Sequence, residues 1–318
     1  MLKDVILAYL TGGEYVSGEM IARQNNVTRN AVWNAVRQLR AQGYEIDSAT
    51  NSGYRLVRQP DILDREVILS GLGVRAEEFD VILYDELDST NCEAFGLARR
   101  GAPAGTVVIA DRQTAGMGRL GRSFFSPPGC GIYMSLILRP QIPPAELPRL
   151  TSFSAVAVAR AVDRLYGVQS GIKWVNDLFL NGKKFCGILS QASFDMESGG
   201  PGIVVIGIGI NVLRTQFPPE LASVAGSLEE LTGRRVSRSA FIPEILTRLY
   251  VSDFVNSDYI DEYRKRSVIL GKNITVNSIR DSYTAAAVEI DDRAALIVRL
   301  EDGSLRTVET GDVSVRLK

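Results

Sequence analysis

The segment GIKWVNDLFLNGKKFCGILSQ, residues 171–191, contains the clearest local folding signal in the chain. Asn181-Gly182 separates two extended runs, 177–180 and 183–191, by two residues. This spacing predicts a hairpin with a type I′ turn, because both central positions of that turn need a positive φ. Residues 171–174 predict a further strand just before the hairpin, so the segment belongs to a sheet.

Strands and helices alternate upstream of this hairpin. We expect strands at 81–84, 106–110 and 132–138, where short apolar runs occur. Helices are expected at 90–100, with Asp88-Ser89-Thr90 able to cap the first turn, and at 147–165. This alternation is typical of an α/β or α+β domain.

The chain downstream of about Gly271 contains short extended segments only. We expect five strands, at 274–276, 286–290, 295–300, 305–308 and 313–316. Turn residues such as Glu301-Asp302-Gly303 separate them. The pattern predicts a small C-terminal β-barrel.

Three short helices and a hairpin are expected at the N-terminus. Residues 2–10 are amphipathic, Ser17 can cap a second helix, and Thr28 can cap a third that runs to about Gln42. Extended stretches follow at 44–46 and 53–56. This order predicts a winged helix-turn-helix, and we place the domains at 1–62, 63–268 and 269–318.

The third helix of this set presents polar side chains beside an apolar face. The candidate DNA contacts are Thr28, Arg29, Asn30, Asn34 and Arg37, and Arg40 adds a third positive charge. A small helical bundle used for dimerisation, with the same charges as a solvated face, is the alternative interpretation. We expect Trp33, next to Val32, to lie in the core. The order of elements and the polarity favour DNA binding.

The composition excludes several classes of chemistry. The chain of 318 residues contains no histidine, which removes Ser-His-Asp and Cys-His catalysis and the usual metal sites that contain histidine. Its net charge of -1 means that DNA binding must come from a local surface. The three cysteines form no CxxC pair, and neither a signal peptide nor a membrane span is recognisable. We therefore expect a cytoplasmic protein that works with lysines, arginines, carboxylates or backbone groups.

The loop QTAGMGRLGR, residues 113–122, combines three glycines with two arginines that can hold phosphate oxygens. It matches G-x-G-x-x-G literally. However, SFFSPPG follows it, and this sequence cannot open the helix that a dinucleotide-binding fold requires. From these residues alone, a flexible surface loop with incidental charges is an equal alternative.

Five ordered motifs together resemble the biotin-protein ligase family. They are Asp88-Ser89-Thr90-Asn91, the glycine-arginine loop, Lys173-Trp174-Val175-Asn176-Asp177, Lys184 before Gly187, and Gly207-Ile208-Gly209-Ile210-Asn211. The resemblance covers the whole chain and is closest to the subclass that combines ligase and biotin-operon repressor. It implies an α+β protein with a central core similar to class II synthetases and a C-terminal SH3-like barrel.

The resemblance also implies the reaction and its catalytic residues. Biotin would attack the α-phosphorus of ATP to give an adenylate and pyrophosphate, and a lysine of the biotin carboxyl carrier protein would then take the biotin. Lys184 would neutralise the biotin carboxylate and the α-phosphate, although its position alone suggests an exposed strand lysine. Arg119 and Arg122 would hold phosphate while the loop closes over the adenylate.

Further roles are carried over by motif. The expected biotin contacts are Ser89, Thr90, Asn91, Gln113, Gly116, Met117, Gly118, Arg119, Lys184 and Gly187. The expected contacts to ATP and its Mg²⁺ are Arg119, Arg122, Phe124, Lys173, Asn176, Asp177 and Asn211, and no resident metal site is expected. The alternative for Ser89 and Thr90 is helix capping alone.

Three positions depart from the family pattern. Met117 replaces an arginine, Phe124 replaces the tryptophan that stacks on adenine, and Val175 replaces a proline. Phe124 can still stack. Met117 removes a guanidinium, so we expect weaker retention of the adenylate.

The resemblance implies partners as well. Biotin, through its adenylate, would act as corepressor and promote homodimerisation on operator DNA. Two rival functions stay open: a metabolite-sensing regulator without ligase turnover, and a ligase for lipoate. Retention of Lys184, Arg119 and Arg122 argues against the first.

Overall fold

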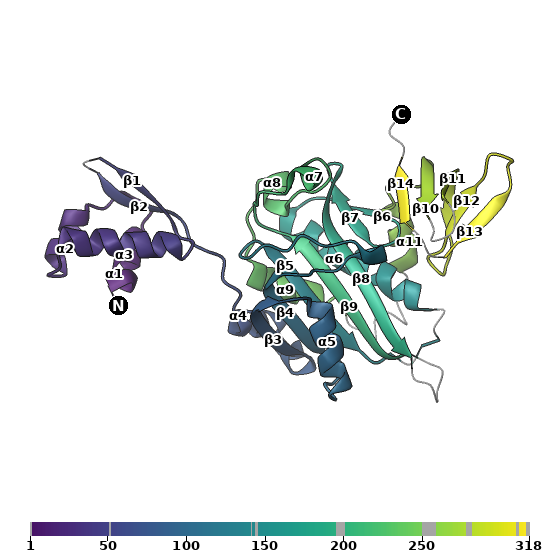
Figure 1. The fold of residues 1–318 in the computed structure, drawn as a ribbon, viewed down its shortest axis with the longest axis horizontal. Helices are drawn as coiled ribbons and strands as arrows, with labels where there is room; N and C mark the ends of the chain where they lie inside the picture. Colours follow the sequence, from purple (N-terminus) through teal and green to yellow (C-terminus); the bar gives the residue numbers. More distant parts are fainter. Residues whose placement is uncertain are drawn as a thin grey trace. The chain divides into compact units, whose positions relative to one another are not determined.

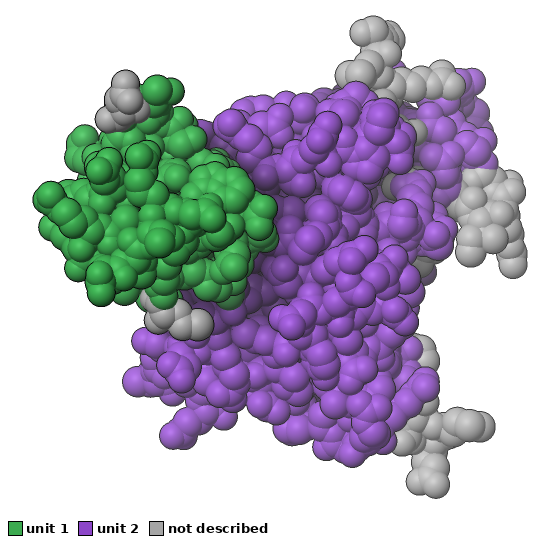
Figure 2. Space-filling model, turned by 60° about the vertical axis from the view of Figure 1, so that its left-hand side comes forward, with its two compact units in different colours: residues 1–62 green, residues 63–318 purple. Residues whose placement is uncertain are grey.

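A computed structural model describes residues 2–50, 52–140, 142–143, 146–194, 201–249, 259–277, 282–309 and 312–315. These fall into two units, residues 1–62 and 63–318 (Figures 1 and 2). Each unit has its own buried core.

Unit 1 contains three helices followed by a two-stranded antiparallel sheet. The elements are α1 (Leu2–Leu10), α2 (Gly18–Gln24), α3 (Arg29–Ala41), β1 (Glu45–Ala49) and β2 (Gly53–Arg58). Ser17 Oγ accepts a hydrogen bond from the Met20 amide, and Thr28 Oγ1 accepts one from the Ala31 amide. Both predicted caps are therefore confirmed, as is the winged helix-turn-helix order.

A seven-stranded mixed sheet forms the centre of unit 2 (Figure 1). Its strands are β3 (Asp80–Leu87), β4 (Thr106–Gln113), β5 (Gly131–Leu138), β6 (Gly171–Lys173), β7 (Asp177–Leu180), β8 (Lys183–Phe194) and β9 (Pro201–Asn211). Their spatial order is β3-β4-β5-β9-β8-β7-β6, and only β3 and β4 run parallel. Asn181 and Gly182 join β7 to β8 with φ values of 49° and 77°, as the predicted turn requires.

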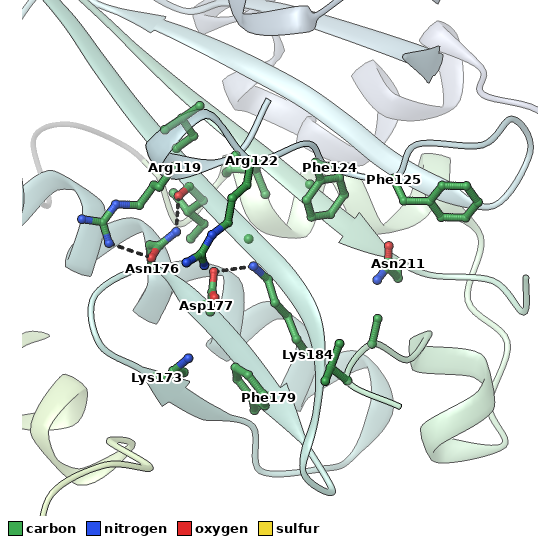
Figure 3. A pocket seen from close by; sticks show the side chains of 18 of the residues that line it. Arg119, Arg122, Phe124, Phe125, Lys173, Asn176, Asp177, Phe179, Lys184 and Asn211 are labelled. Atoms are coloured by element: carbon green, nitrogen blue, oxygen red, sulfur yellow. Dashed lines mark hydrogen bonds and ion pairs between the residues drawn. The ribbon is translucent and has the colours of Figure 1, made fainter. Parts of the chain in front are cut away.

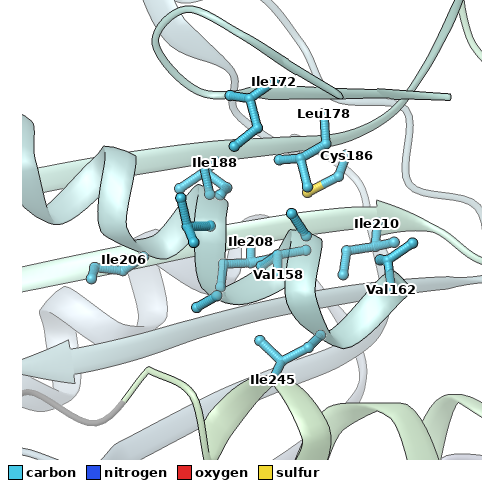
Figure 4. Packing of buried hydrophobic residues seen from close by; sticks show 14 of the residues in the cluster. Val158, Val162, Ile172, Leu178, Cys186, Ile188, Ile206, Ile208, Ile210 and Ile245 are labelled. Atoms are coloured by element: carbon cyan, nitrogen blue, oxygen red, sulfur yellow. The ribbon is translucent and has the colours of Figure 1, made fainter. Parts of the chain in front are cut away.

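Helices cover both faces of this sheet. On one face, α5 (Thr90–Arg99) packs Ala94 and Ala98 against Val108, Ile137 and Val205. On the other face, α6 (Leu147–Tyr166) packs against alternate residues of the same strands. Figure 4 shows this second layer, where Val158 lies beside Ile208 and Val162 beside Ile210. Because side chains alternate along a strand, Gly207 and Gly209 of β9 belong to the α5 face.

Further helices border the sheet. They are α4 (Arg65–Leu72), η1 (Gly73–Glu78), η2 (Arg119–Gly121), α7 (Pro219–Ala222), α8 (Leu228–Thr232), α9 (Arg238–Leu246) and α11 (Tyr259–Lys265). None of the described helices is long and apolar enough to cross a membrane.

The C-terminal strands form an antiparallel sheet in the order β13-β12-β11-β10-β14. They are β10 (Asn273–Asn277), β11 (Ser282–Ile290), β12 (Leu296–Arg299), β13 (Leu305–Val308) and β14 (Asp312–Val315). Arg316, the end of the last predicted strand, lies outside the described residues. That residues 269–318 fold as a domain of their own stays a prediction.

Hydrogen bonds hold the end of β6 to neighbouring segments. Trp174 Nε1 donates to the carbonyl of Ala294, at 2.8 Å, and Tyr263 Oη donates to the carbonyl of Val175, at 3.0 Å. Asn176 and Asp177 follow directly. The turn from β6 to β7 is therefore anchored at the site described next.

A candidate active site on the central sheet

A cavity of about 1180 Å³ opens on the α5 face of the sheet. Two glycines of β9 give it room. A Cβ at Gly207 would overlap the side-chain oxygen of Asn91, and one at Gly209 would lie 2.6 Å from the Phe124 ring. The GIGIN motif thus has a physical cause, because its isoleucines fill the core while its glycines admit Asn91 and Phe124.

Nearly all predicted site residues line this cavity. Only Gly116 does not, and its carbonyl instead accepts a hydrogen bond from the Phe124 amide at 2.8 Å. A Cβ at Gly116 would lie 2.6 Å from the Phe124 carbonyl oxygen, so a glycine is required where the loop folds back. The structure therefore brings together segments that lie far apart in the sequence.

An ion pair occupies the centre of the cavity. Lys184 Nζ, on β8, lies 2.7 Å from Asp177 Oδ1, at the start of β7 (Figure 3). The contact lacks hydrogen-bond geometry, so this buried carboxylate oxygen has no hydrogen-bond donor. The Lys184 side chain is 33% exposed, and it reaches into the cavity, unlike an ordinary exposed lysine on a strand.

Arg119 is held beside this pair. Its Nη1 donates to Asn176 Oδ1 at 3.2 Å, and Asn176 Nδ2 donates to the Ile188 carbonyl at 2.8 Å (Figure 3). The Gly118 amide donates to the Arg122 carbonyl at 2.7 Å, which folds the glycine-arginine loop back on itself. In Figure 3, Arg122 reaches toward Asp177 and Lys184, while Arg119 stands at the adjacent Asn176. Both arginines line the cavity with Lys184, a concentration of positive charge that suits phosphate.

A buried polar network closes one end of the cavity, and we call this end the polar end. The Thr90 amide donates to Gln113 Oε1 at 2.8 Å, and Asn91 Nδ2 donates to Gln191 Oε1 at 2.8 Å. Ser135 Oγ lies 2.8 Å from Thr90 Oγ1 and 2.6 Å from Asn91 Oδ1. Ser89, Thr90 and Asn91 are each less than 5% exposed. A ligand group that forms several hydrogen bonds fits here.

Helix capping does not account for these residues. Ser89 is the N-cap of α5, yet its side chain forms no capping hydrogen bond. The first amide of the helix, that of Thr90, is satisfied by the side chain of Gln113 instead. The alternative that Ser89 and Thr90 serve only as caps is therefore wrong.

Sequence reasoning missed Ser126, Ser135 and Gln191. Apart from the Tyr133 hydroxyl, Ser135 is the one polar side chain in the buried strand GIYMSLIL, residues 131–138, and this exception was a usable signal. Ser126 Oγ accepts a hydrogen bond from Gln113 Nε2 at 3.0 Å. Nothing in the local sequence marks Ser126 or Gln191, because Ser126 meets Gln113 from a loop and Gln191 meets Asn91 from another strand of the sheet.

Aromatic and basic side chains line the rest of the cavity. Phe124 lies against Gly209 and Gly187, and Phe125 meets Phe217 with ring centroids 6.1 Å apart. Lys173 Nζ lies 6.0 Å from the Phe179 ring centroid (Figure 3). Burial raises the pKa of the Cys186 thiol and of the Tyr133 hydroxyl, so neither is a ready nucleophile. Among the described residues, no three His, Cys, Asp or Glu side chains cluster as metal ligands would.

The surface of α3 differs from the sequence prediction at one residue. Trp33 is 47% exposed and does not lie in the core. The buried face of α3 consists of Val32, Ala35, Val36 and Leu39, and Trp33 is turned about 100° from Val32. Its neighbour Arg37 places its guanidinium carbon 4.9 Å from the Trp33 ring centroid.

The other predicted DNA contacts divide by environment. Arg29 and Asn30 are exposed, Asn34 is half-buried, and Thr28 caps the helix. Arg40 donates two hydrogen bonds to the Ile46 carbonyl, at 2.9 and 2.6 Å, and so ties α3 to β1. The Arg40 guanidinium therefore stabilises the packing of α3 against the β1–β2 hairpin.

The fold and the cavity define a protein ligase, and the chain belongs to the biotin/lipoate A/B protein ligase family. The model of that family matches residues 85–211. An HTH domain model matches residues 2–55, and a biotin protein ligase C-terminal domain model matches residues 269–316. The predicted family and fold class are confirmed.

Two bifunctional relatives match over nearly the whole chain, and one solved structure matches three quarters of it. The bifunctional ligase/repressor BirA of Bacillus subtilis is 34% identical over 98% of both chains. BirA of Escherichia coli is 25% identical over 98% of this chain and 96% of its own. The solved biotin protein ligase of Aquifex aeolicus, in complex with biotin and ATP, superposes with a TM-score of 0.64. It is 26% identical and covers 75% of this chain and 99% of its own.

Proposed function

We propose that this protein activates biotin with ATP, transfers it to a lysine of a biotin carboxyl carrier protein, and represses transcription in response to biotin. The relatives named as bifunctional ligase/repressors share all parts of the chain, including the helix-turn-helix. The observation that carries the proposal is the Lys184–Asp177 pair, which stands beside Arg119 in a cavity with a polar end.

The activation step needs fixed positive charge. A biotin carboxylate oxygen forms a bond to the α-phosphorus while the bond to the pyrophosphate oxygen breaks, and negative charge gathers on the phosphate oxygens. We assign Lys184 to the position between the biotin carboxylate and the α-phosphate. There its ammonium group leaves Asp177 and contacts these two anionic groups instead. Arg119 and Arg122 hold the phosphate and retain the adenylate under the loop.

The polar end supports biotin over lipoate. Thr90, Asn91 and Gln113 line this end and offer both donors and acceptors, and Ser135 and Gln191 hold Thr90 and Asn91 in place by hydrogen bonds. The cyclic urea of biotin has N–H and C=O groups that can pair with them, whereas the dithiolane of lipoate has neither. A site built to hydrogen-bond its substrate rejects an analogue that lacks those groups.

The remaining biotin contacts surround this end. We assign Ser89, Met117, Gly118 and Gly187 to them, because these residues line the cavity, whereas Gly116 shapes the loop from behind through its hydrogen bond with Phe124.

The residues around the charged centre are assigned to ATP. We propose that Lys173, Asn176 and Asn211 contact its polar groups and that Phe124 stacks on adenine. Mg²⁺ arrives with the nucleotide and needs few protein ligands, and the Asp177 oxygen that has no hydrogen-bond donor fits this hard cation. When bound, the ion would neutralise phosphate charge.

The regulatory half of the proposal rests on α3. We assign Thr28, Arg29, Asn30, Asn34 and Arg37 to operator DNA, and the biotin adenylate to the role of corepressor that promotes a homodimer. ATP as cosubstrate and three free cysteines support a cytoplasmic location.

The test is transfer of labelled acid to a purified apo carrier domain in the presence of ATP and Mg²⁺. Labelled biotin and labelled lipoate are compared in parallel. The proposal predicts transfer of biotin and none of lipoate. Biotin-dependent DNA binding without any transfer would instead favour a regulator that only senses the metabolite, and transfer of lipoate would reassign the substrate.

A further inference from the structure

Trp33 is a large apolar side chain that stands exposed on α3, although the same helix buries Val32, Val36 and Leu39. Because α3 is proposed to enter DNA, the exposed indole of Trp33 is available to contact a ligand. The neighbouring side chains of α3 indicate which ligand this is.

Trp33 belongs to a row of side chains along one side of α3. Arg29, Trp33 and Arg37 recur every four residues, so they stand one above another on the helix. Asn30 and Asn34 form the adjacent row by the same spacing. Trp33 therefore stands next to Asn30, Asn34 and Arg37, side chains that can read base edges.

Arg37 is held by Trp33 in a specific way. Its guanidinium lies over the indole, 4.9 Å from the ring centroid, and no acid pairs with it among the described residues. Arg40 is committed to the Ile46 carbonyl, and Arg29 lies 3.8 Å from Glu19. Stacking fixes one face of the Arg37 guanidinium against the indole and leaves its N–H edge for an external acceptor. Because the side chain is already ordered, Arg37 loses less conformational entropy when it binds that acceptor.

We propose that Trp33 and Arg37 act as one unit that reads a thymine next to a guanine in the major groove of duplex DNA. The indole packs on the thymine C5 methyl group, and Arg37 donates two N–H groups to guanine O6 and N7. This inference rests on the proposed DNA-binding function and adds the base step that is read. A second copy of the chain is a poorer partner for this surface, because the arginines of two copies would repel each other.

The test uses duplexes that the full chain selects from a random-sequence library in the presence of biotin and ATP. Each thymine is then replaced by deoxyuridine, which removes only the methyl group. We expect replacement at one thymine position to weaken binding about fourfold, the effect of one buried methyl. In the Trp33→Ala variant, the same replacement should have no effect.

The variant itself should bind the selected duplex about tenfold less tightly, because it loses both the methyl contact and the stacked arginine. Trp33→Phe should retain part of the affinity and part of the deoxyuridine effect. Val5→Ala is the matched control, because Val5 is also an exposed apolar residue of unit 1 but lies on α1. It should bind like the unchanged protein.

Fluorescence gives an independent readout. The chain has two tryptophans, and Trp174 is 2% exposed, so quenching of indole emission by DNA reports on Trp33. We expect quenching by the selected duplex. DNA binding with unchanged affinity and unchanged deoxyuridine effects in Trp33→Ala would overturn the inference alone. Failure to select any sequence, with biotin transfer intact, would overturn both this inference and the DNA-binding function.

Discussion

The cavity of unit 2 and the surface of α3 both present positive charge, but they hold it differently. In the cavity, Lys184 lies 2.7 Å from Asp177 and Arg119 bonds to Asn176, so each cation is fixed before any ligand binds. On α3, the Arg29 side chain is 77% exposed and its contact with Glu19 is 3.8 Å long. Fixed charge suits a transition state, whereas exposed charge suits a polyanion whose counterions it displaces.

Removal of a fixed cation should have the largest effect among the following variants. We expect Arg119→Ala to slow biotin adenylation by about 10²- to 10³-fold, as loss of one preorganised donor to a developing anion does. The measurement is biotin-dependent pyrophosphate release. Arg112→Ala is the control, because Arg112 pairs with Glu86 on the surface and does not line the cavity. Equal rates for both variants would mean that Arg119 does not hold phosphate.

Filling the cavity floor should have the next largest effect. In Gly207→Ala, the new methyl group meets Asn91, which must move and lose its contacts to Ser135 and Gln191. We expect unfolding free energy to fall by about 1–3 kcal/mol and the KM for biotin to rise, because overpacking forces side chains to shift. Denaturant unfolding and steady-state kinetics measure the two. Gly12→Ala is the control, because nothing lies near a Cβ at that position, and it should change neither the unfolding free energy nor the KM. An unchanged KM in Gly207→Ala would exclude Asn91 from the biotin site.

Removal of an exposed cation should change the affinity for DNA and the dependence of this affinity on salt concentration. Arg29→Ala is expected to weaken DNA binding about tenfold at low salt and to reduce the salt slope by about one per protomer, because one phosphate contact is lost. All DNA sequences should be affected alike. Titrations at several salt concentrations test this, and an unchanged slope would place Arg29 away from the phosphates.

The smallest expected effect concerns Met117, which is 38% exposed and lines the cavity. Restoring the guanidinium of the family pattern in Met117→Arg should slow release of the biotin adenylate by a factor of about three to ten, the value of one partly exposed ionic contact. Release is followed by chasing bound labelled adenylate with unlabelled ligand. An unchanged release rate would remove the idea that Met117 weakens retention.

Local signals predicted much of the fold. The Asn181-Gly182 turn, the caps at Ser17 and Thr28, and the bounds of α1 followed from the sequence, because turn chemistry and helix capping depend on near neighbours. Helices α4, α8 and α9 were not predicted. They border the sheet as short or irregular segments whose stability comes from packing, and α9 even contains Pro243.

The site was predicted through motifs, and its supporting residues were not. The sequence indicated Lys184, Arg119 and the polar residues from Ser89 to Asn91. Asn91 of α5 lies over Gly207 of β9, and Gln191 reaches it from β8, the strand next to β9. This strand pairing is a long-range contact that spacing along the chain does not encode. Trp33 was misplaced because a tryptophan next to a buried valine is usually buried, and the helical turn between them decided otherwise.

The central claim is that Lys184 supplies the charge for adenylation, and two neighbouring lysines test it most directly. Lys183 lies next to Lys184 on β8, but it pairs with Glu230 and does not line the cavity. In single-turnover measurements of pyrophosphate release with biotin and ATP, we expect Lys184→Ala to be slower by about 10³-fold or more and Lys183→Ala to stay within about twofold. Release at the unchanged rate in Lys184→Ala would contradict the account.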